Sequence, residues 1–167
     1  MNNTLILTYP NDMLLRKALL RINTAYEGGE LKGSLQGVNF PVKFLNDWVK
    51  STKTLTDEEK NIVYKAKNYT YVIAAVENDY STLLHEKAHA LFFLDKNYRE
   101  KATAIWESLS EKVRKNITNI LKLLGYKSDN FLDEFQAYAI EDPFFFGKNA
   151  YLELSQKIKP LKLSLNK

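Results

Sequence analysis

The stretch STLLHEKAHALFF, residues 81–93, holds both histidines of the chain, His85 and His89. They are four positions apart, so a helix places the two imidazoles one turn apart on the same face. Leucines, alanines and phenylalanines surround them, which predicts a mostly buried helix. Two imidazoles in this arrangement can bind one metal ion, and neutral imidazole is a good zinc ligand. The stretch therefore predicts a helix that carries two metal ligands.

A glutamate, Glu86, follows the first histidine and completes the pattern His-Glu-x-x-His. Its carboxylate projects beside the histidine face, where it can reach a metal-bound water without replacing it. Zinc lowers the pKa of such a water from roughly 15.7 to 7, so Glu86 can take its proton as a general base. The alternative interpretation is an ordinary helix that contains two histidines.

The segment TLLHEKAHAL, residues 82–91, resembles the active-site helix of the zincin metallopeptidases. Zincins take a third protein ligand, and their branches differ in where it lies. One branch continues with a glycine and then a histidine or aspartate. The position of that aspartate is Asp95, but Phe92 stands where the pattern has the glycine that turns the chain back. Asp95 is thus one candidate for the third ligand.

The gluzincin branch takes a glutamate from a later helix. The segment FLDEFQAYAIED, residues 131–142, resembles that ligand helix and offers Glu134. Its distance from the first motif is similar to that in the catalytic domain of anthrax lethal factor and related small peptidases, where long helices intervene. The resemblance implies that Glu134 folds back onto the active-site helix. The remaining carboxylates open as ligands are Glu107, Glu111 and Glu141.

Further site residues follow from the same resemblance. In lethal-factor-like peptidases a tyrosine shortly before the ligand helix stabilises the oxyanion, and Tyr126 stands near that position. Tyr138, one helical turn after Glu134, is a second candidate. Metal-ligating histidines also donate their other N–H to a carboxylate or a carbonyl in most metal sites. The candidates for such a carboxylate are Asp95, Asp133 and Glu141.

Two segments are candidates for substrate contact. Residues 69–78, YTYVIAAVEN, are rich in β-branched and aromatic side chains and predict a strand. The zincin resemblance implies an edge strand that an extended peptide joins, so this strand is either that edge or an ordinary core strand. The hydrophobic segment DPFFFG, residues 142–147, either forms the wall of a side-chain pocket or belongs to the core.

Outside these motifs the sequence predicts a predominantly helical α+β fold with a small sheet. Thr56 and Glu59 form a capping box at the start of one helix. The predicted elements are a buried strand at 4–9, a helix that Asp12 caps, a loop or hairpin at 27–37, helices at 42–51 and 57–68, one long helix at 97–124 that Gly125 ends, helices at 130–142 and 149–158, and a solvated basic tail at 157–167.

Composition bounds the class of protein. The 167 residues are 45% hydrophobic, which fits a single domain over residues 1–167 with one core. The net charge is +4, but the basic residues are scattered among acids and form no stripe that would indicate nucleic-acid binding. Because the chain has no cysteine, thiolate ligands and disulfides are excluded. No apolar run is long enough to span a bilayer and no signal peptide is evident, so no membrane partner and a cytoplasmic location are expected.

These observations predict a zinc metalloendopeptidase-like hydrolase with a peptide or protein substrate. In this hypothesis Glu86 activates a zinc-bound water, which attacks the peptide carbonyl. Two alternatives stay open: a zinc amidohydrolase that acts on other substrates at the same site, and a non-catalytic binding protein stabilised by a metal. The sequence indicates neither the cleavage specificity nor the oligomeric state.

Overall fold

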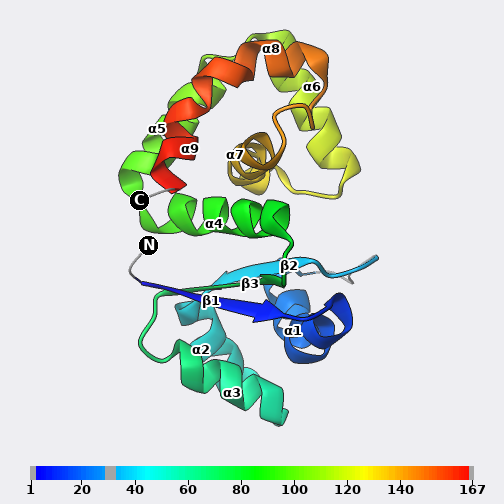
Figure 1. Ribbon diagram of the computed structural model, residues 1–167, viewed down its shortest axis with the longest axis vertical. Helices are drawn as coiled ribbons and strands as arrows, with labels where there is room; N and C mark the ends of the chain where they lie inside the picture. The colour runs from blue at the N-terminus through cyan, green and yellow to red at the C-terminus, as the bar shows by residue number, and fades with distance from the viewer. Residues whose placement is uncertain (1–2, 29–32, 166–167) are drawn as a thin grey trace. The chain divides into compact units, whose positions relative to one another are not determined.

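A computed structural model describes residues 3–28 and 33–165 and confirms a mostly helical α+β chain with a small sheet (Figure 1). The chain forms two compact units, Met1–Glu86 and Lys87–Lys167, and the division falls inside helix α4 (Tyr80–Leu94). Within the described residues, no helix combines the length and apolarity that crossing a membrane requires.

The sheet of the first unit has three strands: β1 (Thr4–Tyr9), β2 (Gly37–Pro41) and β3 (Tyr71–Val76). Their order is β1-β3-β2, with β1 parallel and β2 antiparallel to β3. The predicted strand at 69–78 is confirmed as β3, but its interpretation as an edge is wrong, because β3 is hydrogen-bonded on both sides. Its continuous run of buried apolar residues is typical of a central strand. The edge strands of this sheet are β1 and β2.

Three helices, α1 (Asp12–Glu27), α2 (Val42–Ser51) and α3 (Asp57–Ala66), cover one face of this sheet (Figure 1). Their apolar faces bury a core with the inward side chains of the strands. On β2 those inward residues are Val38 and Phe40, whereas Gly37 and Asn39 alternate onto the opposite face. This alternation is what presents Asn39 to the first turns of α4. Strand β1 alternates as well and is half-buried, not fully buried as predicted.

The starts of α1 and α3 show how short side chains fix helix ends. Helix α1 begins one residue earlier than predicted, because Asn11, not Asp12, is the N-cap and accepts a 3.0 Å hydrogen bond from the Leu14 N–H. The predicted capping box of α3 is confirmed, with Thr56 and Glu59 bonded to each other's backbone N–H. The predicted loop at 27–37 is only partly visible, since residues 29–32 lie outside the described residues.

The second unit is helical after α4: α5 (Lys96–Glu107), α6 (Glu111–Leu123), the 3-10 turn η1 (Ser128–Asn130), α7 (Phe131–Glu141), α8 (Lys148–Lys157) and α9 (Lys159–Leu165). Helix α7 contacts both α5 and α6, and seven of its 11 residues are buried while the rest are half-buried. The predicted helices at 130–142 and 149–158 are confirmed to within one or two residues. The predicted stop at Gly125 is also confirmed, since its φ of 95° lies in the left-handed region that favours glycine.

The prediction of one long helix at 97–124 is wrong. The helix is interrupted at residues 108–110, between α5 and α6. Ser110 caps α6 there by accepting a hydrogen bond from Val113 N–H. Glu153 of α8 accepts from both the backbone N–H and the hydroxyl of Ser110, at 2.9 and 2.6 Å. The apolar stripe continues across the break, since Leu109 and Val113 are both buried. The periodicity therefore could not locate the break, which depends on contacts from α8.

The prediction of a solvated tail after residue 157 is also wrong. Helix α9 packs along α5 and buries Leu161 and Leu165, while Ile158 before it is buried too. Leucine and isoleucine alternate here with lysines, so one face of the helix is apolar and the other solvated. Residues 166 and 167 lie outside the described residues.

Candidate metal centre

Helix α4 is held at its first turn by Asp79. The Asp79 carboxylate accepts hydrogen bonds from the backbone N–H of Thr82 at 3.0 Å and from its hydroxyl at 2.7 Å. Burial raises the pKa of Asp79, but these bonds and one from Ser81 outweigh it and hold the pKa below its usual value. From this capped start the helix runs unbroken to Leu94, so His85 and His89 share one face.

Three potential metal ligands lie together where α4 meets α7. One ligand atom each of His85, His89 and Glu134 lies within 4.8 Å of the other two. His89 and Glu134 are buried, while His85 is half-buried. The Nε2 atom of His89 is 3.8 Å from Oε2 of Glu134. Ligand atoms around a tetrahedral zinc ion are roughly 3.4 Å apart, given bonds of about 2.1 Å, so these residues are close to the spacing that a metal needs.

Asp133 sets the orientation of His89. Its Oδ1 is 2.8 Å from Nδ1 of His89. When Asp133 accepts this hydrogen bond, Nδ1–H is the donor and Nε2 of a neutral imidazole keeps its lone pair. That lone pair lies on the side of Glu134. A lone pair and a carboxylate repel each other unless a cation or a proton lies between them, so the donor set fits a metal ion.

A buried network holds Asp133 in turn. Gln136 donates to Asp133 Oδ1 at 3.0 Å, and the Tyr98 hydroxyl donates to the Gln136 carbonyl oxygen at 2.6 Å. Gln136 is fully buried, and Tyr98 is nearly so. Burial raises the pKa of Tyr98, and the charge of Asp133 raises it further, so its hydroxyl stays protonated. Asp133, one of the three carboxylates predicted to support a histidine, lies against the imidazole of His89.

The competing carboxylates do not join the group. Asp95 is the N-cap of α5 and accepts a 3.2 Å hydrogen bond from Tyr98 N–H. Glu107 and Glu111 are exposed, and Glu141 lies at the end of α7. In the described part of the chain, the group of His85, His89 and Glu134 is the only cluster of this kind. Asp95 is not part of the cluster because α4 ends at Leu94 and Asp95 lies beyond that helix end.

The buried carboxylate of Glu86 has a partner that the sequence did not reveal. Nδ2 of Asn39, on β2, donates to Oε2 of Glu86 at 2.7 Å. The hydroxyl of Tyr71, on β3, donates to Oδ1 of Asn39 at 2.5 Å, which fixes the amide with its N–H groups toward Glu86. Gly37 lies beside them, and a Cβ there would overlap the Glu86 carboxylate and Thr82. Gly37 and Asn39, which lie on the same face of β2, thus fix the position of the Glu86 carboxylate.

The two candidate tyrosines lie beside Glu134. The hydroxyls of Tyr126 and Tyr138 are 3.1 Å apart. Burial raises the pKa of Tyr126 far above its ordinary value, and the Glu134 carboxylate and the Tyr138 hydroxyl raise it further. Tyr126 is therefore a protonated donor at neutral pH. Tyr138 stacks on Phe145 with ring centroids 4.1 Å apart, so its ring is fixed from the other side.

No protein-family model matches the chain, and no curated protein and no solved structure matches it either. Asn39 and Tyr71 are the residues that the sequence did not flag. The alternation along β2 indicates that Gly37 and Asn39 share one face of the sheet, opposite to Val38 and Phe40. No local pattern in the sequence connects that face to Glu86.

Proposed function

We propose that the chain is a zinc-dependent hydrolase that cleaves peptide bonds, with His85, His89 and Glu134 as the metal ligands. The observation that carries the proposal is the convergence of two imidazoles and a buried carboxylate. A second buried carboxylate, Glu86, follows the ligand His85 directly in the sequence. Two histidines and one glutamate leave a coordination position open, which is typical of catalytic zinc sites and not of structural ones.

The neighbouring groups support ligation by these residues. Asp133 contacts Nδ1 of His89, which leaves Nε2 on the side of Glu134, and Gln136 and Tyr98 hold Asp133. Carboxylates in this position increase the basicity of a ligating imidazole and fix its tautomer. When bound, zinc would lower the pKa of water and polarise the scissile carbonyl.

Glu86 serves in this proposal as the general base and then as the general acid. It takes a proton from the attacking water and passes it to the leaving amine, as a carboxylate near the metal can. Asn39 holds one oxygen of Glu86 in place by its 2.7 Å hydrogen bond, which makes Asn39 a positioning residue. The protonated hydroxyl of Tyr126 is the donor suited to the developing oxyanion, and Tyr138 orients it.

The edge of β2 favours a peptide over other amides as substrate. Val76 N–H donates to Gln36 C=O, and Val42 N–H donates to Thr70 C=O. The backbone N–H and C=O groups of the even-numbered residues of β2 therefore point toward β3. Because directly bonded pairs alternate in antiparallel strands, the backbone groups of Gly37 and Asn39 point to the outer edge. An extended peptide added there would run beside Glu86. We therefore expect a substrate peptide to pair with β2, because β3 is hydrogen-bonded on both sides.

The first experiment measures zinc and activity in the same preparation. We expect about one zinc per wild-type chain by elemental analysis and hydrolysis of an unstructured protein substrate. A chelator should abolish the hydrolysis, and added zinc should restore it. His85→Ala should lower both zinc content and activity. A wild-type protein that stays metal-free at micromolar zinc would refute the proposal.

The role of Asn39 gives a separate prediction. Asn39→Leu keeps the shape of the side chain and removes the donor to Glu86. A hydrogen bond to a charged group contributes about 1.5–3 kcal/mol, so kcat should fall about 10- to 100-fold while zinc content and KM change little. Tyr71→Phe removes only the group that fixes the amide, so its effect should be smaller. An unchanged kcat in Asn39→Leu would show that Asn39 does not position the base.

A further inference from the structure

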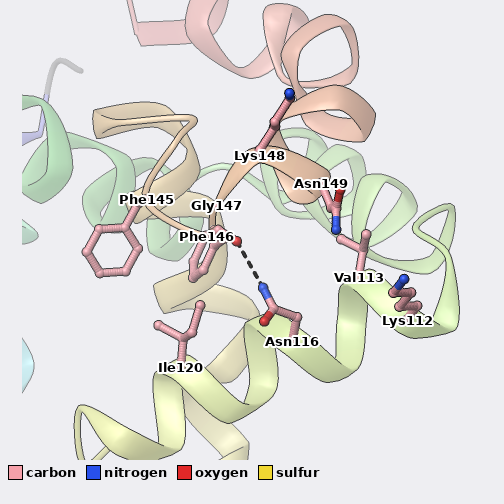
Figure 2. Close-up of a pocket in the computed structure, with 9 residues that line it drawn as sticks. All are labelled: Lys112, Val113, Asn116, Ile120, Phe145, Phe146, Gly147, Lys148 and Asn149. Carbon is pink, nitrogen blue, oxygen red and sulfur yellow. Dashed lines mark hydrogen bonds between the residues drawn. The ribbon is translucent and has the colours of Figure 1, made fainter.

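A cavity of 440 Å³ lies within the second unit, formed by α6, the start of α8 and the segment that joins α7 to α8 (Figure 2). Its volume is within the range of small-ligand sites. One wall is apolar, with Val113 and Ile120 of α6 and the aromatic residues Phe145 and Phe146. The two phenylalanine rings meet edge to face at 5.1 Å.

The apolar wall is fixed in place. Asn116 Nδ2 donates to the carbonyl oxygen of Phe146 at 2.9 Å, and this bond crosses from α6 to the joining segment (Figure 2). Phe146 is buried, and its ring also lies against Phe135 and Tyr138. Phe145 stacks on Tyr138 yet keeps about a third of its surface exposed, at 36%. Both phenylalanines line the cavity, and the expectation that residues 142–147 belong to the core is confirmed for Phe146. That this segment forms a pocket for a substrate side chain stays a prediction.

The polar part of the lining is basic. Lys112 and Lys148 lie at its rim, and none of the nine residues drawn around the cavity in Figure 2 is acidic. Both lysines are exposed, and no ion pair joins either ammonium group to an acid in residues 3–28 or 33–165. The lining therefore complements a negative charge. The side-chain amide of Asn149 adds both a donor and an acceptor.

We infer that this cavity binds the C-terminal residue of a peptide, with its carboxylate beside Lys112 and Lys148 and an apolar last side chain against Phe145 and Ile120. The three parts of the lining match the three parts of that ligand: cations for the carboxylate, an apolar wall for the side chain and amides for the peptide bond. The cavity uses no residue of the metal centre, so the inference does not depend on the proposed function.

The test is a titration of the full-length protein, followed by amide NMR shifts of Asn116, Asn149 and their neighbours. The probes are N-acetyl-leucyl-phenylalanine, its C-terminal amide and N-acetyl-leucyl-glycine. We expect the free acid to bind at least fivefold more tightly than the amide or the glycine peptide, and more weakly at high salt, because rim charges are screened. Equal affinity for acid and amide, or no binding at millimolar concentration, would overturn the inference.

Two pairs of lysine substitutions localise the effect. Lys112→Gln with Lys148→Gln should reduce the affinity for the acid at least fivefold and leave the amide unchanged. Lys115→Gln with Lys122→Gln removes two exposed lysines of the same helix that do not line the cavity, and it should change neither. If both pairs weaken binding equally, the effect is one of net charge and the cavity is not the site.

Repeating the titration after zinc removal separates this site from the metal centre. Binding at the cavity should persist in the chelated protein, because no proposed metal ligand lines it. If binding disappears with the metal, the carboxylate was bound at the zinc, and the cavity proposal is wrong while the zinc proposal stands.

Discussion

Glu86→Gln is expected to lower kcat for peptide hydrolysis by about 10²- to 10⁴-fold, the usual contribution of a positioned general base. Glutamine has nearly the same shape as glutamate but carries no charge and cannot accept the proton of the attacking water. Its amide oxygen can still accept from Asn39, so the buried contact and the fold should survive. Because Glu86 is not one of the three clustered ligands, the zinc content should stay near the wild-type value.

The control for this substitution is Glu77→Gln. Glu77 is exposed and directly follows β3. Its replacement by glutamine removes the same charge at a position outside the site, so activity should be unchanged. Zinc analysis and hydrolysis are measured on each variant. Activity within tenfold of wild type would remove Glu86 from the role of base. Loss of zinc from Glu86→Gln would instead make it a metal ligand.

Glu134→Gln is expected to lose most of its zinc. The amide is a much poorer zinc ligand than a carboxylate, and Nε2 of His89 would then lie beside a neutral group. Because metal affinity depends on the full set of ligands, we expect occupancy at micromolar zinc to fall to well below half, and hydrolysis to fall with it. Equilibrium dialysis against a zinc buffer, with activity measured in parallel, checks both.

Two variants test whether this loss is specific. Glu141→Gln changes an acid near the end of the same helix, outside the cluster, and should keep its zinc. Asp95→Ala removes the N-cap of α5, which should cost about 0.5–2 kcal/mol of stability but no zinc. If Asp95→Ala lost the metal and Glu134→Gln kept it, the third ligand would be Asp95.

The choice between Asp95 and Glu134 shows what a motif can and cannot predict. The absence of a glycine at Phe92 was a local sign that the chain does not turn back there. The structure agrees, because α4 continues to Leu94 and Asp95 then caps the next helix. That Glu134 lies next to His89, however, depends on how α5 and α6 pack around α7, and no local pattern encodes this.

Asn39 and the break before Ser110 were missed for a related reason. An asparagine in a strand and a serine in a helical stripe are ordinary residues in a sequence. Their roles come from partners far along the chain: Glu86 for Asn39, and Glu153 for Ser110. Hydrogen bonds between distant segments leave no periodic signal, whereas apolar faces do.

The sequence alone determined the features that depend on neighbours within about one helical turn. These are the common face of His85 and His89, the capping box at Thr56 and Glu59, and the strand character of residues 71–76. Each follows from backbone geometry, which relates residues at fixed spacing.

Only the tertiary structure decided which distant groups meet these elements. It placed Glu134 and Asp133 at His89, Asn39 at Glu86, and β3 in the centre of the sheet instead of at its edge. The physical reason is that such contacts are set by the packing of whole helices and strands around a shared core. Their free energy depends on burial and on hydrogen bonds that exist only once the chain has folded.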